Sequence, residues 1–403
     1  MAKLGFFLVC VHEDGHRIHL IRTEGRTPQA DPGEIAQLLT RTSADLPASP
    51  LGLTLRHPLA SQIETPLAWP SLVRQPVRND YPLLACRELG VRFLRVPASD
   101  LDDDLQRKRL GWLRDDGVQV TASWLWRDGL DLAAEVAARA KFLDGVEVQL
   151  AGSLWPDADS LAAIRTCRER SGKPVLLSPA LPGWTVPGKQ HNRTQTAYQI
   201  DELVHLNQLL AKHDCLIDCV LCSIEWSDDF ASTWTALCAS PAMLSHISAL
   251  ELDAPLSGDE QQQSVQMAEA CWLAAQTGAR IWLNPLIDLD RTMDIEVGLL
   301  DRLNNPRPAF HVARCLNTLL FGRGRRWQPI DAPAIAGLRL RILERSDTAR
   351  AILAILDRNA KPDLSALFAQ IDNGQQARVY GLASGRARPW LPASGCWKKR
   401  SCF

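Results

Sequence analysis

"RIWLNPLIDLD", residues 280–290, has the pattern of a short apolar strand, and "GLLDRLNNPRPAFHVARCLNTLL", residues 298–320, adds a turn, a proline-rich breaker and one amphipathic helix. Proline fixes its own backbone and disfavours helix in the residue before it, so the segment 305–308 marks the end of a loop. The helix is predicted to run from Ala309 to Leu320. A strand that leads through a loop into a helix is the repeating unit of α/β folds.

The same unit recurs upstream, where segments with helical spacing alternate with short apolar runs. The other strands are expected at 51–57, 91–98, 118–126, 146–152, 174–180, 216–226 and 247–255. Helices are expected at 104–116, 131–143, 159–172, 201–213 and 260–278, and most open on an aspartate that suits an N-cap. Eight strands with intervening helices in roughly 240 residues match an α/β fold of the (β/α)8 TIM-barrel type, whose usual size is about 250 residues. A doubly wound sheet is the alternative, but no glycine-rich phosphate loop follows any strand.

Segments with strand-like alternation flank the barrel on both sides. "GFFLVCV" and "RIHLI" bracket Asp14-Gly15, a favourable hairpin turn, and further segments after residue 336 alternate at period two. We expect a small β-sandwich after the barrel, with the N-terminal hairpin as a candidate to complete it. The predicted boundaries are 1–45 for an N-terminal hairpin and helix, 46–322 for the barrel, 323–393 for the sandwich and 394–403 for an irregular tail.

The composition gives no sign of a polyanionic partner. The 403 residues include 45 Lys and Arg against 46 Asp and Glu, a formal net charge of -1, so we expect neither nucleic acid nor membrane as a partner. The N-terminus lacks a signal-peptide pattern, and no segment reaches the roughly 18 apolar residues of a membrane span. The 11 cysteines lie mostly single in apolar runs, as reduced core residues do. We therefore expect a cytoplasmic protein with a small or uncharged ligand.

Tryptophans are frequent near the expected C-terminal ends of the strands, where TIM-barrel enzymes carry their functional groups. An exposed indole presents a flat apolar face on which a sugar ring packs, while the sugar hydroxyls bind a few placed polar groups. The alternative is that some indoles only fill space between barrel and helices. The candidate carbohydrate contacts are Trp124, Trp126, Trp155, Trp226 and Trp282, with Arg95, Asp253 and Asn284 as polar partners.

Two glutamates at the ends of neighbouring strands are candidates for catalysis. Glycoside hydrolysis uses one carboxylic acid to protonate the leaving oxygen and one carboxylate as base or nucleophile, about 5 to 9.5 Å apart. Glu225 and Glu251 end adjacent expected strands, so the distance between their side chains is expected to fall in that range. The alternative for each is a solvated or arginine-paired side chain.

Three motifs resemble retaining glycoside hydrolases of the large (β/α)8 clan, most like the β-xylosidase and α-L-iduronidase family. "ELGVRFLRVPA" looks like the second strand of that clan, "ISALELDAP" like its seventh, and residues 280–320 like its eighth strand and closing helix. The resemblance covers residues 88–322. It implies that Glu251 is the nucleophile and that Arg95 lies beside it.

The fourth strand departs from that clan, in which it ends in Asn-Glu with the glutamate as general acid/base. Here it reads "GVEVQLAG", so Leu150 and Ala151 stand at those positions. Alanine transfers no proton, and general acid–base catalysis contributes about 10²- to 10⁴-fold. Glu147 is expected inside the barrel or paired, which leaves Asp157 from the following loop or Glu225 from the sixth strand as the acid.

The sequence leaves three functions open. The first is a hydrolase with Glu251 as nucleophile and Glu225 or Asp157 as acid. The second is a non-catalytic carbohydrate-binding or regulatory protein that retains the sugar cleft without an acid. The third is a metal-dependent sugar isomerase or lyase, which needs several converging ligands. The residues available for such a metal site are Glu251, Asp253, His213 and Asp288. We expect a carbohydrate or glycoside partner, with no cofactor and no metal.

Overall fold

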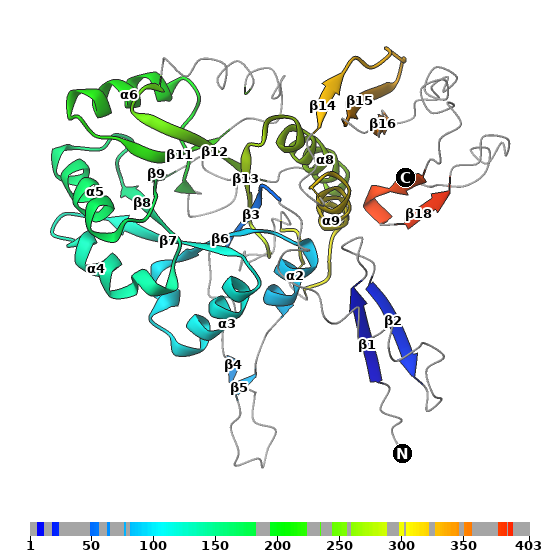
Figure 1. The fold of residues 1–403 in the computed structure, drawn as a ribbon, viewed down its shortest axis with the longest axis horizontal. Helices are drawn as coiled ribbons and strands as arrows, with labels where there is room; N and C mark the ends of the chain where they lie inside the picture. Colours follow the sequence, from blue (N-terminus) through cyan, green and yellow to red (C-terminus); the bar gives the residue numbers. More distant parts are fainter. Residues whose placement is uncertain are drawn as a thin grey trace.

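The structure, a computed structural model, describes most of the barrel and parts of the flanking segments. The described residues are 6–11, 18–23, 49–55, 63–64, 76–77, 81–182, 194–223, 234, 244–255, 259–287, 298–301, 304–321, 327–345, 350–356, 378–384 and 386–389. Within them, a closed barrel of parallel strands forms the centre of the structure (Figure 1).

The barrel has the strands and the order that a TIM barrel requires. The strands are β3 (Leu51–Thr54), β6 (Phe93–Pro97), β7 (Gln119–Trp126), β8 (Gly145–Ala151), β9 (Val175–Pro182), β11 (Ile217–Ser223), β12 (Ile247–Pro255) and β13 (Arg280–Asn284). They pair in the order β9-β11-β12-β13-β3-β6-β7-β8, and the pairing of β8 with β9 closes the ring. The predicted TIM barrel is confirmed, and each predicted barrel strand is present.

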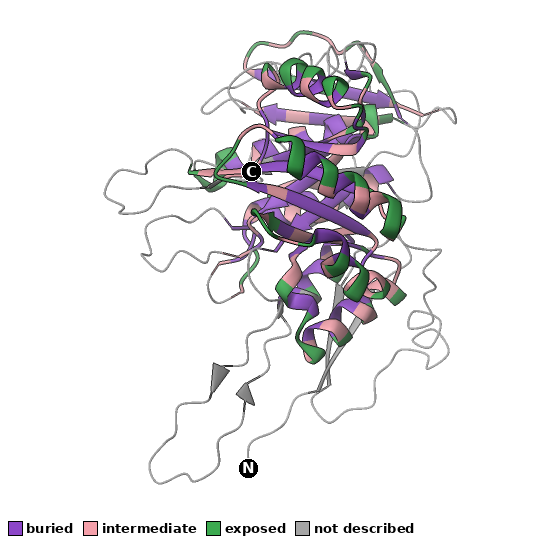
Figure 2. Cartoon of the chain, turned by 90° about the vertical axis from the view of Figure 1, so that its left-hand side faces the viewer, coloured by how far each residue is buried: buried purple, intermediate pink, exposed green. Residues whose placement is uncertain are grey.

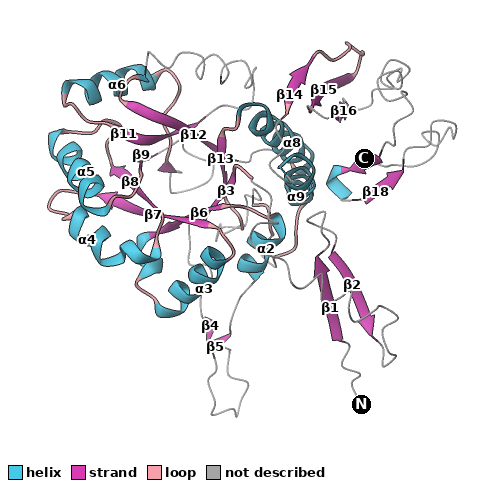
Figure 3. Ribbon diagram, viewed as in Figure 1, coloured by secondary structure: helices cyan, strands magenta, loops and turns pink. Residues whose placement is uncertain are grey.

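Helices surround the strands on the outside, as Figure 3 shows. They are α2 (Tyr81–Leu89), α3 (Asp104–Asp115), α4 (Leu132–Arg139), α5 (Ala158–Ser171), α6 (Glu202–Lys212), α8 (Glu260–Thr277) and α9 (Pro308–Phe321), with short 3-10 turns η2 (Ala98–Leu101) and η3 (Ala140–Phe142). The aspartates whose side chains cap a helix N-terminus are Asp103, Asp131, Asp157 and Asp259. Gly172 and Gly278 end α5 and α8 in the left-handed conformation, which glycine adopts at little cost. None of the helices described here is long and apolar enough to cross a membrane.

Successive residues of each strand point alternately toward the helices and into the barrel. Outward side chains such as Leu94 and Val96 belong to the large apolar core that strands and helices share. Figure 2 shows this core as buried strands beneath helices whose outer faces are exposed. Inside the barrel, Leu176, Leu221 and Trp282 form a second, smaller apolar cluster. The interior of the barrel is therefore a layer of its own, separate from the core beneath the helices.

Gly52 leaves room for the indole of Trp282 inside the barrel. A Cβ atom on Gly52 would lie 2.6 Å from Cε3 and 2.8 Å from Cζ3 of that indole, and 3.0 Å from Cβ of Phe93. Overpacking of this kind costs about 1–3 kcal/mol. We therefore expect Gly52→Ala to lower the free energy of unfolding by that amount, measured by urea titration.

Gly111 offers the matched control for this substitution. Nothing lies within 4 Å of a Cβ atom added there, and alanine is favoured over glycine by about 1 kcal/mol inside a helix such as α3. Gly111→Ala is expected to raise the free energy of unfolding. Equal losses in both variants would contradict the close approach of Gly52 and Trp282.

Small antiparallel sheets flank the barrel. β1 (Phe6–Val11) pairs with β2 (Ile18–Thr23), as expected for the two segments around Asp14-Gly15. On the C-terminal side, three strands form one sheet and two form another. These strands are β14 (Gln328–Ile330), β15 (Leu338–Glu344) and β16 (Arg350–Leu356), then β17 (Arg378–Gly381) and β18 (Arg386–Pro389), with a 3-10 turn η6 (Leu382–Ser384) between the last two. Two further short strand pairs involve β4 (Ile63–Glu64) with β5 (Pro76–Val77), and β10 (Thr194–Gln195) with β9. A β-sandwich built from the C-terminal sheets stays a prediction, and residues 394–403 lie outside the described part.

Candidate ligand site inside the barrel

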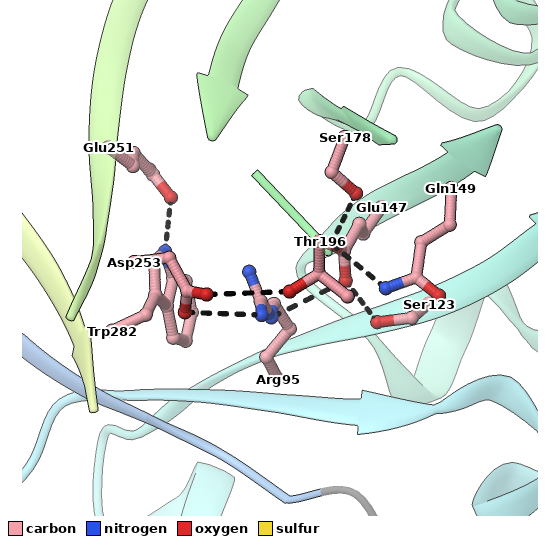
Figure 4. A network of polar contacts seen from close by, with 9 residues as sticks. All are labelled: Arg95, Ser123, Glu147, Gln149, Ser178, Thr196, Glu251, Asp253 and Trp282. Carbon is pink, nitrogen blue, oxygen red and sulfur yellow. Dashed lines mark hydrogen bonds and ion pairs between the residues drawn. The ribbon is translucent and has the colours of Figure 1, made fainter. Parts of the chain in front are cut away.

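Arg95 lies at the centre of a polar network inside the barrel (Figure 4). It comes from β6 and is 1% exposed. Its Nε lies 3.4 Å from Oε2 of Glu147 on β8, and its Nη2 lies 3.7 Å from Oδ1 of Asp253 on β12. Its guanidinium carbon lies 5.4 Å from the centre of the Trp282 ring. These strands are not neighbours of β6, so the contacts cross the interior and tie opposite walls together.

Glu147 is the most completely bonded carboxylate of this network. It is 0% exposed and accepts hydrogen bonds from the Ser123 hydroxyl, from Oγ of Ser178 at 2.7 Å and from Nε2 of Gln149 at 3.3 Å. A buried carboxylate needs such donors because it has lost its water. Sequence reasoning expected Glu147 inside the barrel or paired, and the structure places it there. Ser178 and Ser123 were not predicted as partners of Glu147, although the alternation of side chains along β9 and β7 places both serines on the inner face of the barrel.

Asp253 faces Arg95 from the opposite wall. It is 7% exposed, and its Oδ2 accepts a hydrogen bond from Oγ1 of Thr196 at 3.4 Å. Thr196 follows β10, and two residues later Tyr198 bridges to Cys222 of β11. This short segment therefore lies against the C-terminal ends of β9 and β11 and brings Thr196 into the network. Nothing in the sequence indicated this contribution from outside the eight strands.

Glu251 lies deeper in the barrel than Asp253. The two are two residues apart on β12, so Glu251 lies about 6.6 Å further from the C-terminal end of the strand, at roughly 3.3 Å per residue. It is 4% exposed, and its carboxylate accepts from Nε1 of Trp282 at 2.6 Å and from Nη1 of Arg280 at 2.5 Å. Burial raises the pKa of the neighbouring Cys219 thiol, and the charge of Glu251 raises it further. Glu251 is thus held by residues near the N-terminal end of β13, and Arg95 faces Asp253 and Glu147 instead.

The described tryptophans do not surround the network as exposed platforms. Trp282 is 0% exposed and Trp124 is 6% exposed. On β7, Ser123 points into the barrel, so the alternation sends Trp124 and Trp126 outward, where both pack with the core beneath the helices. Trp155 is half-buried on the loop after β8 and stacks on Tyr198 with ring centres 6.2 Å apart. These three indoles fill space between barrel and helices, the alternative that the sequence left open.

Asp157 serves as the N-cap of α5. Its side chain accepts a hydrogen bond from the backbone N–H of Ser160 at 2.8 Å, and this bond holds the pKa of Asp157 below its usual range. A general acid in this chemistry needs a raised pKa, so the capping bond does not suit Asp157 to the role expected from the sequence. The other candidate acid, Glu225, lies outside the described residues, as does Trp226.

The remaining candidates lie at the strand ends or away from them. Asn284 ends β13 and is 2% exposed. Ala151 ends β8 and is exposed, at the position where the resemblance expected the acid. His213 is the C-cap residue of α6, where its carbonyl accepts from Arg165. Among the described residues no three His, Cys, Asp or Glu side chains are grouped as metal ligands would be, and Asp288 is not among them.

Asp100, in η2 just after β6, makes the stability of the fold depend on pH. It is 2% exposed, and burial raises its pKa to about 6, with a further contribution from the charge of Asp103. The folded protein therefore holds this proton more tightly than the unfolded chain, so the contribution of Asp100 to stability falls as the pH rises from about 4 to about 6. We expect Asp100→Asn to remove this fall and to be more stable than the wild type at pH 7 by on the order of 1 kcal/mol.

Thermal melts between pH 3.5 and 7.5 measure this difference. Asp157→Asn is the control, because Asp157 has a lowered pKa and stays ionised throughout the window where Asp100 titrates. Its pH profile should keep the wild-type slope between pH 4 and 6. A wild-type slope in Asp100→Asn would show that another group causes the fall.

The strand order places this chain in the TIM-barrel class. Neither the models of known families nor the curated proteins gave a match. Among solved structures, a calcium-binding mutant of β-glucuronidase 2 from Bacteroides uniformis is similar at 9% identity and a TM-score of 0.45, over 78% of this chain and 43% of that chain. This chain thus spans less than half the length of the glucuronidase.

Two further similar structures differ in activity. An endo-β-1,3-glucanase of glycoside hydrolase family 128 from Amycolatopsis mediterranei, in complex with laminaripentaose, has 10% identity and a TM-score of 0.40, over 66% of this chain and 98% of that chain. Dihydrodipicolinate synthase from Oceanobacillus iheyensis has 8% identity and a TM-score of 0.32, over 68% and 74%. At these identities we take no function from the likenesses.

Proposed function

We propose that this chain is a carbohydrate-active protein that binds a glycoside or oligosaccharide at the C-terminal mouth of its barrel. The observation that carries the proposal is the layer formed by Arg95, Glu147 and Asp253. Above and beside it lie the half-buried polar side chains of Gln149 and Thr196. A few placed charged and amide groups beside the buried indole of Trp282 are what a hydroxyl-rich ligand requires.

Binding without efficient turnover is the form of this function that the geometry favours. In the resemblance to retaining glycoside hydrolases, the acid belongs at the end of the fourth strand, where this chain has the exposed Ala151. The carboxylate of that strand, Glu147, is 0% exposed and already accepts several hydrogen bonds. A carboxylate in that state accepts hydrogen bonds well and reaches a glycosidic oxygen poorly. We therefore assign it a binding or positioning role.

The test of the proposal is a binding screen on the wild-type protein. Neutral mono- and disaccharides are added one at a time, and saturation-transfer NMR detects contact between sugar and protein. We expect a signal from at least one sugar, and loss of that signal in Asp253→Asn, which keeps the shape of the side chain. Absence of binding by every sugar in the panel would refute the proposal.

Hydrolysis is the second candidate, favoured by the approach of Arg95 to Asp253. The resemblance implied an arginine beside the nucleophile, and Asp253 is the carboxylate of β12 that meets this condition, at 3.7 Å. In this form of the function Asp253 replaces Glu251 as nucleophile, and Glu225 supplies the acid. The resemblance to the β-xylosidase and α-L-iduronidase family supports hydrolysis and not mere binding.

Aryl glycosides with good leaving groups separate the two candidates, since they need little help from an acid. Turnover that Asp253→Asn abolishes and Glu251→Gln retains would support hydrolysis with Asp253 as nucleophile. The reverse result would return that role to Glu251. No turnover on any aryl glycoside, together with sugar binding in the NMR screen, would support the binding protein.

A further inference from the structure

Two buried polar atoms on neighbouring strands of the barrel have no hydrogen-bond partner in the part of the chain that the structure describes. They are Nη1 of Arg95 and Oγ1 of Thr54, in residues that are 1% and 8% exposed. Thr54 and Arg95 are register partners on β3 and β6. Gly52 faces Trp282 inside the barrel, and Thr54, two residues further along β3, faces the same side. Figure 4 shows one terminal nitrogen of Arg95 without a dashed line.

Such atoms are costly when they stay without a partner. A buried donor that finds no acceptor loses the full free energy of its hydration, and natural proteins rarely leave one so. Thr54 and Arg95 are paired in register on β3 and β6, so both side chains start from the same level of the barrel's inner face. We call these two side chains the Thr54–Arg95 corner. A ligand oxygen between the two side chains would accept a hydrogen bond from each of them.

The charges around the corner select the kind of oxygen. Arg95 brings one positive charge, whereas Glu147 and Asp253 bring two negative charges within 3.4 and 3.7 Å of its nitrogens. A carboxylate or phosphate of a ligand would meet both of these carboxylates in a buried site, where like charges are poorly screened. A neutral hydroxyl meets no such repulsion. It accepts from Arg95 and Thr54 and donates its own hydrogen to a carboxylate oxygen.

We infer that the Thr54–Arg95 corner takes a hydroxyl group of an uncharged sugar or polyol, and that the site discriminates against sugars carrying an acidic group. This inference rests on the proposed function and narrows its ligand class. The competing occupant is a buried water, which also gives and accepts hydrogen bonds. The experiment has to separate the two.

The test variant is Thr54→Val, which replaces the hydroxyl by a methyl group of the same shape. Thr166→Val is the control, because the Thr166 hydroxyl donates to the carbonyl of Ala162 within α5 at the surface. The probes are neutral methyl hexosides and pentosides, together with the methyl glycosides of uronic acids of matching configuration, which keep a free carboxylate. Calorimetry gives the affinities, and thermal melts give the unfolding midpoint of each unliganded protein.

The expected result has three parts. Thr54→Val melts at or above the wild-type temperature, because an unpartnered hydroxyl has been removed. It binds the neutral sugar roughly fivefold to tenfold more weakly than Thr166→Val, which corresponds to one lost hydrogen bond. The wild type binds the uronide at least about tenfold more weakly than the neutral sugar, as expected for a like charge in a buried site.

Other outcomes overturn the inference in distinct ways. The inference would be refuted if a neutral sugar bound Thr54→Val as tightly as the wild type, or if the wild type bound the uronide as tightly as the neutral sugar. Either result would leave the proposed function standing. A lowered melting temperature with unchanged sugar affinity would identify a structural water as the occupant. Binding of no sugar at all would refute the proposed function and the inference together.

Discussion

Replacing Arg95 by methionine is expected to lower the free energy of unfolding by about 3–5 kcal/mol, the usual cost of removing one partner from a buried ion pair. Methionine fills similar space but leaves Glu147, 0% exposed, and Asp253, 7% exposed, without their shared positive charge. The two carboxylates then face the barrel interior together. Urea titration at pH 7 measures the loss.

Two further variants keep this prediction falsifiable. Arg339→Met removes the surface pair with Glu269, whose side chains are 50% and 25% exposed, and is expected to cost less than about 1 kcal/mol. Adding Glu147→Gln and Asp253→Asn to Arg95→Met should recover part of the loss, because the buried negative charges are gone. A loss below 1 kcal/mol in Arg95→Met, or no recovery in the triple variant, would contradict the network in Figure 4.

Replacing Trp282 by alanine is the second large effect, with an expected loss of about 3–5 kcal/mol. The indole is 0% exposed and lies against Gly52, Phe93 and the guanidinium of Arg95. Its removal leaves a cavity and takes away the donor that Oε2 of Glu251 accepts from at 2.6 Å. Urea titration again gives the size of the loss.

Trp282→Phe separates the cost of the cavity from the cost of the lost hydrogen bond to Glu251. Phenylalanine keeps an aromatic ring but has no N–H, so Glu251 loses one hydrogen bond while most of the packing remains. We expect it to cost less than half of the loss seen for Trp282→Ala. Near-ultraviolet circular dichroism, which senses the fixed indole, should change in both variants. Equal losses in Trp282→Ala and Trp282→Phe would show that the hydrogen bond and not the packing dominates.

The barrel could be predicted from the sequence because its signals are local. Each strand is a short apolar run, and several helices have an aspartate cap or a terminal glycine such as Gly172 and Gly278. The breaker at 305–308 likewise marks the start of α9. These features depend on neighbours in the chain, so period and turn chemistry are enough to find them.

The site depends on how strands are staggered around the barrel, which periodicity does not contain. Glu251 and Asp253 both point inward from β12, but Glu251 pairs in register with Arg280, the first residue of β13. That register puts Glu251 deep and leaves Asp253 nearer the mouth. Thr196 was missed for a similar reason, since it reaches Asp253 from a segment beside the strands.

The tryptophans show a second limit of the sequence. Strand β7 reads "QVTASWLW", in which both alternating sets contain apolar residues. The set that contains Ser123 is mostly polar and the set that contains Trp124 is wholly apolar, but the pattern alone does not say which of the two faces the barrel interior. Trp124 and Trp126 were therefore candidates for the mouth until the position of Ser123, which donates to Glu147, assigned the opposite set to the interior.

The most direct test of a carbohydrate site inside the barrel is a calorimetric titration of one neutral sugar, chosen from the NMR screen, into three proteins. The wild type and Asp157→Asn are predicted to bind it equally, since Asp157 caps α5. Asp253→Asn is predicted to bind at least about tenfold more weakly, because a hydrogen bond to a charged group is lost. Equal affinity in all three proteins, or no binding by the wild type, would contradict a carbohydrate site on Arg95 and Asp253.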